Sequence, residues 1–309
     1  MLDRHSKIDY YNFMEIRVLK YFLAVAREGS ITGAANSLHL TQPTLTRQLQ
    51  ELEKELGQQL FIRGKHRISL TQEGLMLRKR AGEIVEMVEK TEAEFKSIRD
   101  VICGDIYIGS GETDSMKYIA EVMKDMQTDY PDVKFHIFSG NAEDVIEKLD
   151  RGLLDFGVLI QPIDLSKYDN LTLPAKDVWG VIMREDSPLA VKKSVTMEDL
   201  KNLPIIASRQ MSKKYSADSG FLDWFGEDFE KLNITATYNL VYNAAIMVKA
   251  GIGYAVTLDK LINTSKSDGI IFRPLSPKLE SGLDIVWKKN QVFSPAGKIF
   301  LERLQTKSG

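Results

Sequence analysis

The chain has one cysteine, Cys103, among its 309 residues, and only four histidines. A single thiol cannot form an intramolecular disulfide, nor can it supply the two or more thiolates of a structural zinc site. The histidines are scattered at positions 5, 39, 66 and 136, so no metal-binding cluster is visible. We therefore expect neither a metal nor any other resident cofactor.

Long apolar runs are also missing. No stretch of 18 uncharged apolar residues exists, which excludes a membrane-spanning helix. Residues 1–13 lack the apolar core of a secretory signal, so we expect a cytoplasmic protein with no membrane partner. Those 13 residues precede the first patterned segment, and whether they are a native, functional extension stays open.

What is present is an ordinary globular composition, 43% hydrophobic and 27% charged, long enough for about two domains. The charge is uneven. Residues 1–83 carry 13 Lys or Arg against 9 Asp or Glu, a net of +4, whereas residues 84–309 carry 28 against 34, a net of −6. A basic end on an acidic body favours an N-terminal nucleic-acid contact, although a solvated face gives the same excess.

Residues 14–73 have the pattern of a winged helix-turn-helix. Apolar residues recur at helical spacing over 14–27, over 31–38 after the cap Ser30, and over 42–56 after the cap Thr41. Pro43 is tolerated in the first turn of the third helix. The segment 60–70 then predicts two short strands around Gly64, which form a wing.

A longer helix is predicted from Thr71 to about Arg99. One side of it repeats with heptad spacing, which is the geometry of a dimerising coiled coil, and the alternative is packing on its own domain. The seam consists of Leu77, Ala81, Ile84, Val88, Thr91, Phe95 and Ile98.

After Cys103 the pattern changes to short apolar runs that alternate with helices. This texture predicts βαβ units and a mostly parallel sheet, with crossovers between two lobes near Pro162 and Pro174. The fold class is thus α/β behind an all-α winged helix-turn-helix.

The residues of these segments resemble those of a known protein family. Leu19 to Gly74 look like the winged helix-turn-helix of LysR-type transcriptional regulators. The matching features include Gly29-Ser30, Ala34-Ala35, Thr41-Gln42-Pro43, Arg47, Leu52-Glu53, Leu60-Phe61, Arg63 and Leu70-Thr71. The remainder, including residues 250–253, is similar to the effector domain of that family.

The resemblance implies a two-lobed domain like the periplasmic binding proteins, with a small-molecule inducer between its lobes. It also implies dimers that pair into homotetramers, promoter DNA as partner, and RNA polymerase if the protein activates. The expected domains are the extension 1–13, the winged helix-turn-helix 14–73, the dimerisation helix 74–102 and the effector domain 103–309. Lobe I would comprise about 103–162 and 268–309, and lobe II about 163–267.

The DNA contacts are expected on the third helix and the wing. A helix of this length fits the major groove, and its leucines face inward, which leaves polar side chains for base edges or phosphates. Arg47 suits either guanine or a phosphate, and the basic wing tip suits phosphates or a narrow minor groove. The candidates are Gln42, Pro43, Thr44, Arg47, Gln50, Arg63, Lys65, His66 and Arg67.

The effector contacts are expected where strands end, because ligands of parallel α/β sheets bind beyond the carboxyl ends of strands. Each Ser, Thr or Asn there could instead be only a helix cap. The candidates are Ser110, Glu112, Thr113, Ser139, Asn141, Ser208, Arg209, Tyr242 and Asn243. Ser110, Thr113, Ser139 and Ser208 match the family's inducer contacts most clearly.

Glu112 and Asp114 depart from the uncharged turn that carboxylate-binding members carry. Two acids there would repel a dicarboxylate, so an amine or zwitterion is our hypothesis, with Arg209 able to take its carboxylate.

Three other classes of function are weighed against a regulator. An enzyme is disfavoured because Cys103 lies away from the predicted turns and no GxSxG, GxGxxG or phosphate-loop motif is present. A transported-solute binding protein would need a secretory signal. A nucleoid-type protein would bind DNA with no inducer, so a bound ligand separates it from a regulator. The inducer, the target genes and the choice between activation and repression stay open.

Overall fold

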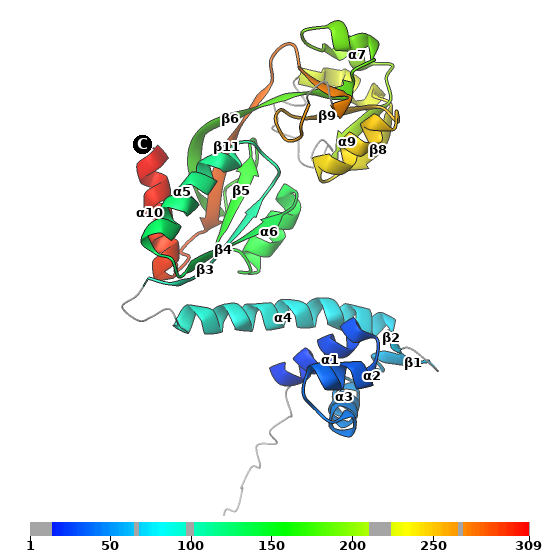
Figure 1. The fold of residues 1–309 in the computed structure, drawn as a ribbon, viewed down its shortest axis with the longest axis vertical. Helices are drawn as coiled ribbons and strands as arrows, with labels where there is room; N and C mark the ends of the chain where they lie inside the picture. Colours follow the sequence, from blue (N-terminus) through cyan, green and yellow to red (C-terminus); the bar gives the residue numbers. More distant parts are fainter. Residues whose placement is uncertain (1–13, 65–67, 97–101, 210–223, 265–267, 309) are drawn as a thin grey trace, which may run out of the picture. The chain divides into compact units, whose positions relative to one another are not determined.

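The computed structural model describes residues 14–64, 68–96, 102–209, 224–264 and 268–308. The chain divides into two compact units, Met1–Glu92 and Ala93–Gly309 (Figure 1). Among the described residues, no helix combines the length and the apolar character needed to cross a membrane.

Three helices form the core of the first unit: α1 (Ile16–Glu28), α2 (Ile31–Ser37) and α3 (Gln42–Leu56). The predicted caps are present, since the Ser30 side chain accepts from Gly33 N and the Thr41 side chain from Thr44 N. Gly29 and Gly57 end α1 and α3 in the left-handed conformation, at φ 63° and 64°. Phe22, Leu45, Leu49 and Leu52 are buried, which confirms these positions of the predicted helix faces, whereas Leu56 at the end of α3 is 40% exposed.

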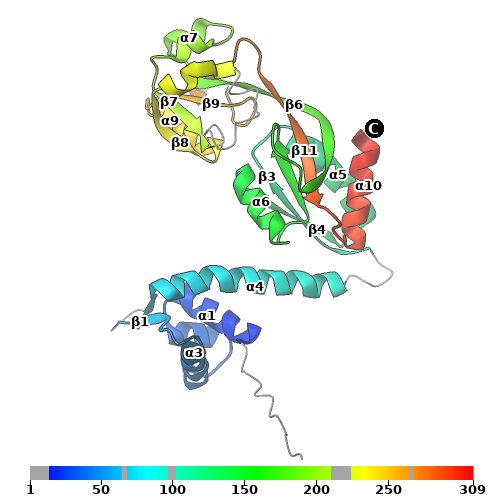
Figure 2. The same ribbon diagram turned by 180° about the vertical axis from the view of Figure 1, so that it is seen from behind.

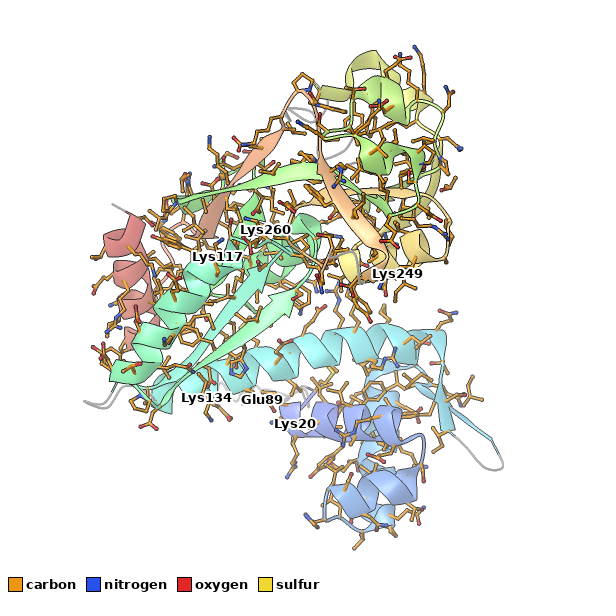
Figure 3. The ribbon with its side chains drawn as sticks, turned by 45° about the horizontal axis from the view of Figure 1, so that its top comes forward. Lys20, Glu89, Lys117, Lys134, Lys249 and Lys260 are labelled. Carbon is orange, nitrogen blue, oxygen red and sulfur yellow. The ribbon has the colours of Figure 1, made fainter. Side chains whose placement is uncertain are left out.

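A two-stranded wing follows, β1 (Phe61–Arg63) paired antiparallel with β2 (Ile68–Leu70), as predicted. The Phe61 ring lies 5.2 Å from that of Phe22, so the wing packs on the helical core. The long helix α4 (Gln72–Lys96) then leaves the wing, and Lys20 of α1 forms a 2.8 Å ion pair with Glu89 of α4 (Figure 3).

Lobe I of the second unit is a sheet with helices on both faces (Figure 1). Its strands are β3 (Gly104–Ser110), β4 (Val133–Ser139), β5 (Phe156–Ile160), β11 (Glu280–Lys288) and the first part of β6 (Tyr168–Arg184). Helices α5 (Met116–Asp129) and α10 (Pro295–Ser308) bury Ile119 and Phe300 against one face. Helix α6 (Ala142–Asp150) buries Val145 against the other.

Lobe II repeats this layering around the second part of β6 (Figure 2). Its other strands are β7 (Ile205–Ser208), β8 (Ile234–Tyr238), β9 (Tyr254–Leu258) and β10 (Ile270–Pro274). Helix α9 (Val241–Lys249) covers one face. The short helices α7 (Met197–Leu200) and η3 (Gly226–Lys231) cover the other, and η1 (Pro188–Val191) follows β6.

The chain crosses between the two lobes at positions that differ from the predicted lobe boundaries. Leu171 and Leu173 of β6 pair with Ile285 and Leu283 of β11 in lobe I, so residues 163–173 do not belong to lobe II. Strand β10 pairs with Gly180–Arg184 of β6, so residues 270–274 belong to lobe II and not to lobe I. The first crossover is therefore near Pro174, which is one of the two predicted points, and not near Pro162, which is the other. The boundaries were wrong because an antiparallel ladder between segments a hundred residues apart leaves no local pattern.

Candidate functional site

The outer face of α3 presents the predicted DNA-contacting residues to solvent. Gln42, Pro43, Thr44, Arg47 and Gln50 are all exposed, whereas Leu45, Leu49 and Leu52 of the same helix are buried. The helix therefore offers one polar surface with hydrogen-bond donors and acceptors that the rest of the domain does not cover.

Within this face, part of the bonding capacity is used locally. The Thr41 and Thr44 hydroxyls lie 2.8 Å apart, in addition to the capping bond from Thr44 N. Arg47 Nε is 3.7 Å from Glu51 Oε1, and the Arg47 side chain is 72% exposed. An ion pair this exposed is weak, so the guanidinium can exchange Glu51 for a base or phosphate.

The wing is fixed by Glu53, a residue for which the sequence predicts no role in the site. The Glu53 carboxylate on α3 accepts from the backbone N–H groups of Leu60 and Phe61, at 2.8 and 3.2 Å. On the other side of the wing, Ile68 N donates to the Gly29 carbonyl at 3.0 Å. Of the predicted wing contacts, Lys65, His66 and Arg67 lie outside the described residues, and Arg63 ends β1.

The start of α4 packs differently from the predicted seam. Leu77 and Ala81 are buried in the core of their own winged domain together with Val85, so for them the alternative of intradomain packing is correct. Ile84 is 38% exposed and Val88 half-buried. Ile84 and Val88 thus form a narrower apolar edge than the predicted seam, and the side chains of Phe95 and Ile98 lie outside the part that the structure describes.

In lobe I the predicted effector residues lie at adjacent strand ends. Ser110 of β3 and Ser139 of β4 are direct neighbours in the parallel register, and Gly140 N donates to the Ser110 carbonyl at 3.0 Å. Ser139 is exposed, whereas Ser110 is buried and its hydroxyl donates to the Gly111 carbonyl. Asn141 caps α6 by accepting from Asp144 N, as the capping alternative predicts.

Thr113 faces the strand that both lobes share. Its hydroxyl donates to the Asp177 carboxylate of β6 at 2.5 Å, and Ser115 Oγ donates to the same carboxylate at 2.9 Å. All three side chains are buried. The turn after β3 is therefore tied to the crossover between the lobes.

Glu112 and Asp114 from the same turn reach lobe II. Val241 N, the first N–H of α9, donates to Glu112 Oε2 at 2.5 Å. Asp114 Oδ2 lies 2.7 Å from Lys117 Nζ and 3.8 Å from Lys260 Nζ of lobe II. The hydrogen bond to Asp114 raises the pKa of Lys117. Each of the two carboxylates therefore already has a hydrogen-bond or ion-pair partner within the protein.

The lobe II candidates divide by exposure. Ser208 ends β7 and is buried, while Arg209 beside it is exposed. Tyr242 and Asn243, in the first turn of α9, are both exposed. Because Glu112 bonds to Val241, the first turn of α9 in lobe II lies next to the Ser110–Thr113 turn of lobe I.

No group of three or more His, Cys, Asp or Glu suited to a metal ion occurs among the residues that the structure describes.

Two family models cover almost the whole chain. Residues 16–75 match the bacterial regulatory helix-turn-helix protein, lysR family, and residues 99–309 match the LysR substrate binding domain. The chain belongs to the LysR family of transcriptional regulators. LysR-type proteins bind DNA through the first domain and an effector through the second, and they are regulators, not enzymes.

Characterised and uncharacterised relatives of this LysR-type regulator align along its length. It is 29% identical over 302 residues to the Hca operon transcriptional activator HcaR of Escherichia coli (strain K12), covering 94% of this chain and 97% of that one. It is 26% identical over 291 residues to the regulator YvbU of Bacillus subtilis (strain 168), covering 94% and 97%.

Solved LysR structures share the fold of this regulator. CbnR superposes with a TM-score of 0.74 at 19% identity, covering 96% of this chain and all of CbnR. CbnR in complex with its target DNA gives 0.72 at 20% identity, covering 95% of this chain and 100% of that one. At these identities the likeness establishes the fold.

Proposed function

We propose that this LysR-type regulator reads promoter DNA with the outer face of α3. The observation that carries the proposal is the contrast on one helix between buried leucines and the exposed Gln42, Thr44, Arg47 and Gln50. Arginine can donate two hydrogen bonds to guanine, and glutamine can pair with an adenine edge. Pro43, in the first turn of the helix, contributes contact surface.

In this proposal the wing supports α3 by contacting the DNA backbone. Arg63, Lys65, His66 and Arg67 supply the cations, which would neutralise phosphates and release counterions. Glu53 sets the wing relative to α3 through the backbone of Leu60 and Phe61. The DNA complex formed by CbnR, which has the same fold, supports this assignment of the domain.

The proposed regulator acts in the cytoplasm as an oligomer. A dimer would form along α4 through the edge that includes Ile84 and Val88, and dimers would pair into a tetramer. Two winged domains related by symmetry would then read a dyad-symmetric site. RNA polymerase is the further partner if the bound protein activates transcription, as the relative HcaR does by its name.

The effector is proposed to bind where the lobes meet. Ser110, Ser139 and Asn141 offer polar groups from lobe I, and Ser208, Arg209, Tyr242 and Asn243 offer them from lobe II. Thr113 and Glu112 border the same junction through their bonds to Asp177 and Val241. A ligand that prefers one arrangement of the lobes shifts the population of arrangements and thereby the DNA-binding form.

We propose an amine or a zwitterion as the class of effector, and only one of the two acids in the turn after β3 supports this proposal. Asp114 already contacts Lys117 and Lys260, and these two positive charges weaken its electrostatic attraction for an ammonium group. Glu112 is then the acid that would receive the amine, and the exposed Arg209 would receive a carboxylate. Tight binding of simple dicarboxylates, with no binding of amines, would contradict this hypothesis.

The test of the proposed function is a footprint on the DNA that flanks the gene, repeated with a panel of amines, amino acids and dicarboxylates. We expect a protected dyad-symmetric site whose length one compound changes. The Arg47→Ala variant should lose the footprint while the oligomer persists, and the matched Arg17→Ala variant, at an exposed arginine of α1, should keep it. Equal footprints from Arg47→Ala and the parent would show that α3 is not the reading helix.

A further inference from the structure

The four residues after Gly111 bind two different parts of the molecule in alternation, the strand β6 and lobe II. Thr113 and Ser115 donate to Asp177 of the shared strand β6. Glu112 and Asp114 instead contact lobe II, through Val241 and Lys260. One short turn of lobe I is thus anchored at the crossover by its hydroxyls and joined to the other lobe by its carboxylates.

We propose that Glu112 is an internal tether that holds the two lobes together before any effector binds. The residues that it joins are 129 positions apart, and the bond from Val241 N to Glu112 Oε2 is 2.5 Å long. Glu112 is half-buried and Val241 is buried, so solvent screens this contact less than a surface ion pair.

The electrostatics of α9 favour a carboxylate at this position. The first N–H groups of a helix have no partner within the helix, and they carry a partial positive charge. In α9 the residue before the first turn is Leu240, whose side chain cannot cap. Glu112 takes the role that a Ser, Thr, Asn or Asp cap usually fills, but it does so from the other lobe.

A second link from the same turn runs parallel to the first. Asp114 contacts both Lys117 at the start of α5 and Lys260 after β9. Figure 3 labels these two lysines. The Lys260 contact is longer, at 3.8 Å, and its side chain is 64% exposed, so it contributes less than the Glu112 bond. It explains how the lobes would stay aligned when the Glu112 bond opens transiently.

The tether gives the proposed effector a defined task, an inference that rests on the proposed function. An effector that brings an acidic group to the first turn of α9 competes with Glu112 for the Val241 N–H. An effector that brings an amine binds Glu112 itself and weakens its hold on α9. In both cases the ligand changes the lobe arrangement by acting on one bond that already exists.

The experiment measures the distance between the lobes in the full-length protein without effector or DNA. Spin labels go on V191C in lobe II and V292C in lobe I, since these side chains are 89% and 90% exposed, in a C103S background. Labelled chains are diluted into an excess of unlabelled chains, so that pulsed electron paramagnetic resonance reports distances within one chain. The variants are Glu112→Gln, Glu112→Ala and Glu112→Ala combined with Lys260→Gln, with Glu302→Gln on the exposed face of α10 as matched control.

We expect one narrow distance distribution for the parent and for Glu302→Gln. Glu112→Ala should add a population at longer distance, on the order of a tenth of the chains or more, and the double variant should enlarge it. Glu112→Gln, which keeps an acceptor oxygen but no charge, should show a smaller increase. Hydrogen exchange of the Val241 amide should accelerate in the same order.

Distributions for Glu112→Ala and the double variant that superpose on the parent, with unchanged exchange at Val241, would overturn the tether. Because neither DNA nor effector is present, this result is independent of the footprint: a chain that fails to protect its promoter could still show the tether, and the reverse also holds.

Discussion

The Thr113 hydroxyl and the buried Asp177 carboxylate lie 2.5 Å apart, and they join the turn after β3 to the strand that both lobes share. Asp177 is 5% exposed and accepts a second hydrogen bond from Ser115. A carboxylate buried this far is stable only when donors surround it. Thr113 therefore has a structural task whatever its part in effector binding.

Replacing Thr113 by Val keeps the shape of the side chain and removes the donor. Since a hydrogen bond to a charged group contributes more than a neutral one, we expect the free energy of unfolding of the effector domain to fall by about 2 kcal/mol. Urea denaturation followed by circular dichroism measures this. Thr128→Val, which removes a hydroxyl bound to the Lys124 carbonyl on the exposed side of α5, is the control and should change it by less than about 1 kcal/mol. Equal effects of the two substitutions would contradict the role of the Asp177 contact.

Gly74 in the first turn of α4 admits no side chain. A Cβ there would overlap the Leu60 carbonyl oxygen at the base of the wing. Gly74→Ala should destabilise the winged domain by roughly 2 kcal/mol or more, in the range of overpacked sites. At Gly82, in the same helix, an added Cβ would meet open space. Gly82→Ala should therefore stabilise the domain by about 0.5–1 kcal/mol, because alanine is the better helix former. Thermal melts of both variants with opposite shifts would confirm the prediction.

Glu53 should affect DNA binding without touching DNA. Glu53→Ala leaves the N–H groups of Leu60 and Phe61 without their acceptor, so the wing loses its fixed position on α3. We expect the affinity for the promoter site to fall by about 10-fold, equivalent to about 1.4 kcal/mol. Glu55→Ala, at an exposed position of the same helix, removes a negative charge as well and should leave affinity equal or slightly higher. Fluorescence anisotropy with labelled duplex compares the two, and a loss limited to Glu55→Ala would refute the assignment.

Self-association through α4 predicts a specific effect of Ile84. Ile84→Glu places a charge on the apolar edge next to Val88. We expect the dissociation constant of the oligomer to rise by 10-fold or more, which corresponds to about 1.4 kcal/mol. Burying an unpaired charge in the interface costs more free energy than this. Leu56→Glu, at a 40% exposed residue that ends α3, makes the same change away from α4 and should not. Sedimentation velocity over a concentration series distinguishes them. An unchanged mass for Ile84→Glu would place the interface elsewhere.

Salt dependence tests the contribution of the cations on α3 and the wing. Each phosphate contact adds about 0.9 to the slope of log K against log salt concentration, so the parent should show a steep fall of affinity with salt. If Arg47 contacts a phosphate, Arg47→Ala reduces that slope by about 1 and weakens binding to all sequences alike. If Arg47 reads a guanine, the slope stays and discrimination at one base pair is lost. A flat response of the parent would contradict phosphate neutralisation by the wing.

The sequence predicted the elements whose signals are local. Ser30 and Thr41 cap α2 and α3 as expected, and Gly29 and Gly57 end helices, because each of these effects operates within one turn of chain. The exposed polar face of α3 followed from leucine spacing alone. These are the parts of the site on which the DNA-binding proposal depends.

The remaining features depend on partners that are distant in the chain. Strand β11 was not predicted, and it became a strand by pairing with β5 and β6, which are over a hundred residues earlier. The acids Glu112 and Asp114 looked unpaired in sequence, yet they meet Val241 and Lys260 of the other lobe. Leu77 and Ala81 fitted a heptad, but heptad spacing does not distinguish a partner chain from the helix's own domain.

Leu173 and Leu283 sit directly opposite each other in the ladder of β6 and β11, at the point where the chain leaves lobe I and where it returns. Everything between them is therefore topologically an insert within lobe I. Joining these two positions by a tight hairpin turn would give lobe I as one uninterrupted polypeptide, while the excised piece would have its two ends side by side. Lobe II is thus a cassette, and in principle another insert whose ends lie equally close could replace it without rerouting the strands of lobe I.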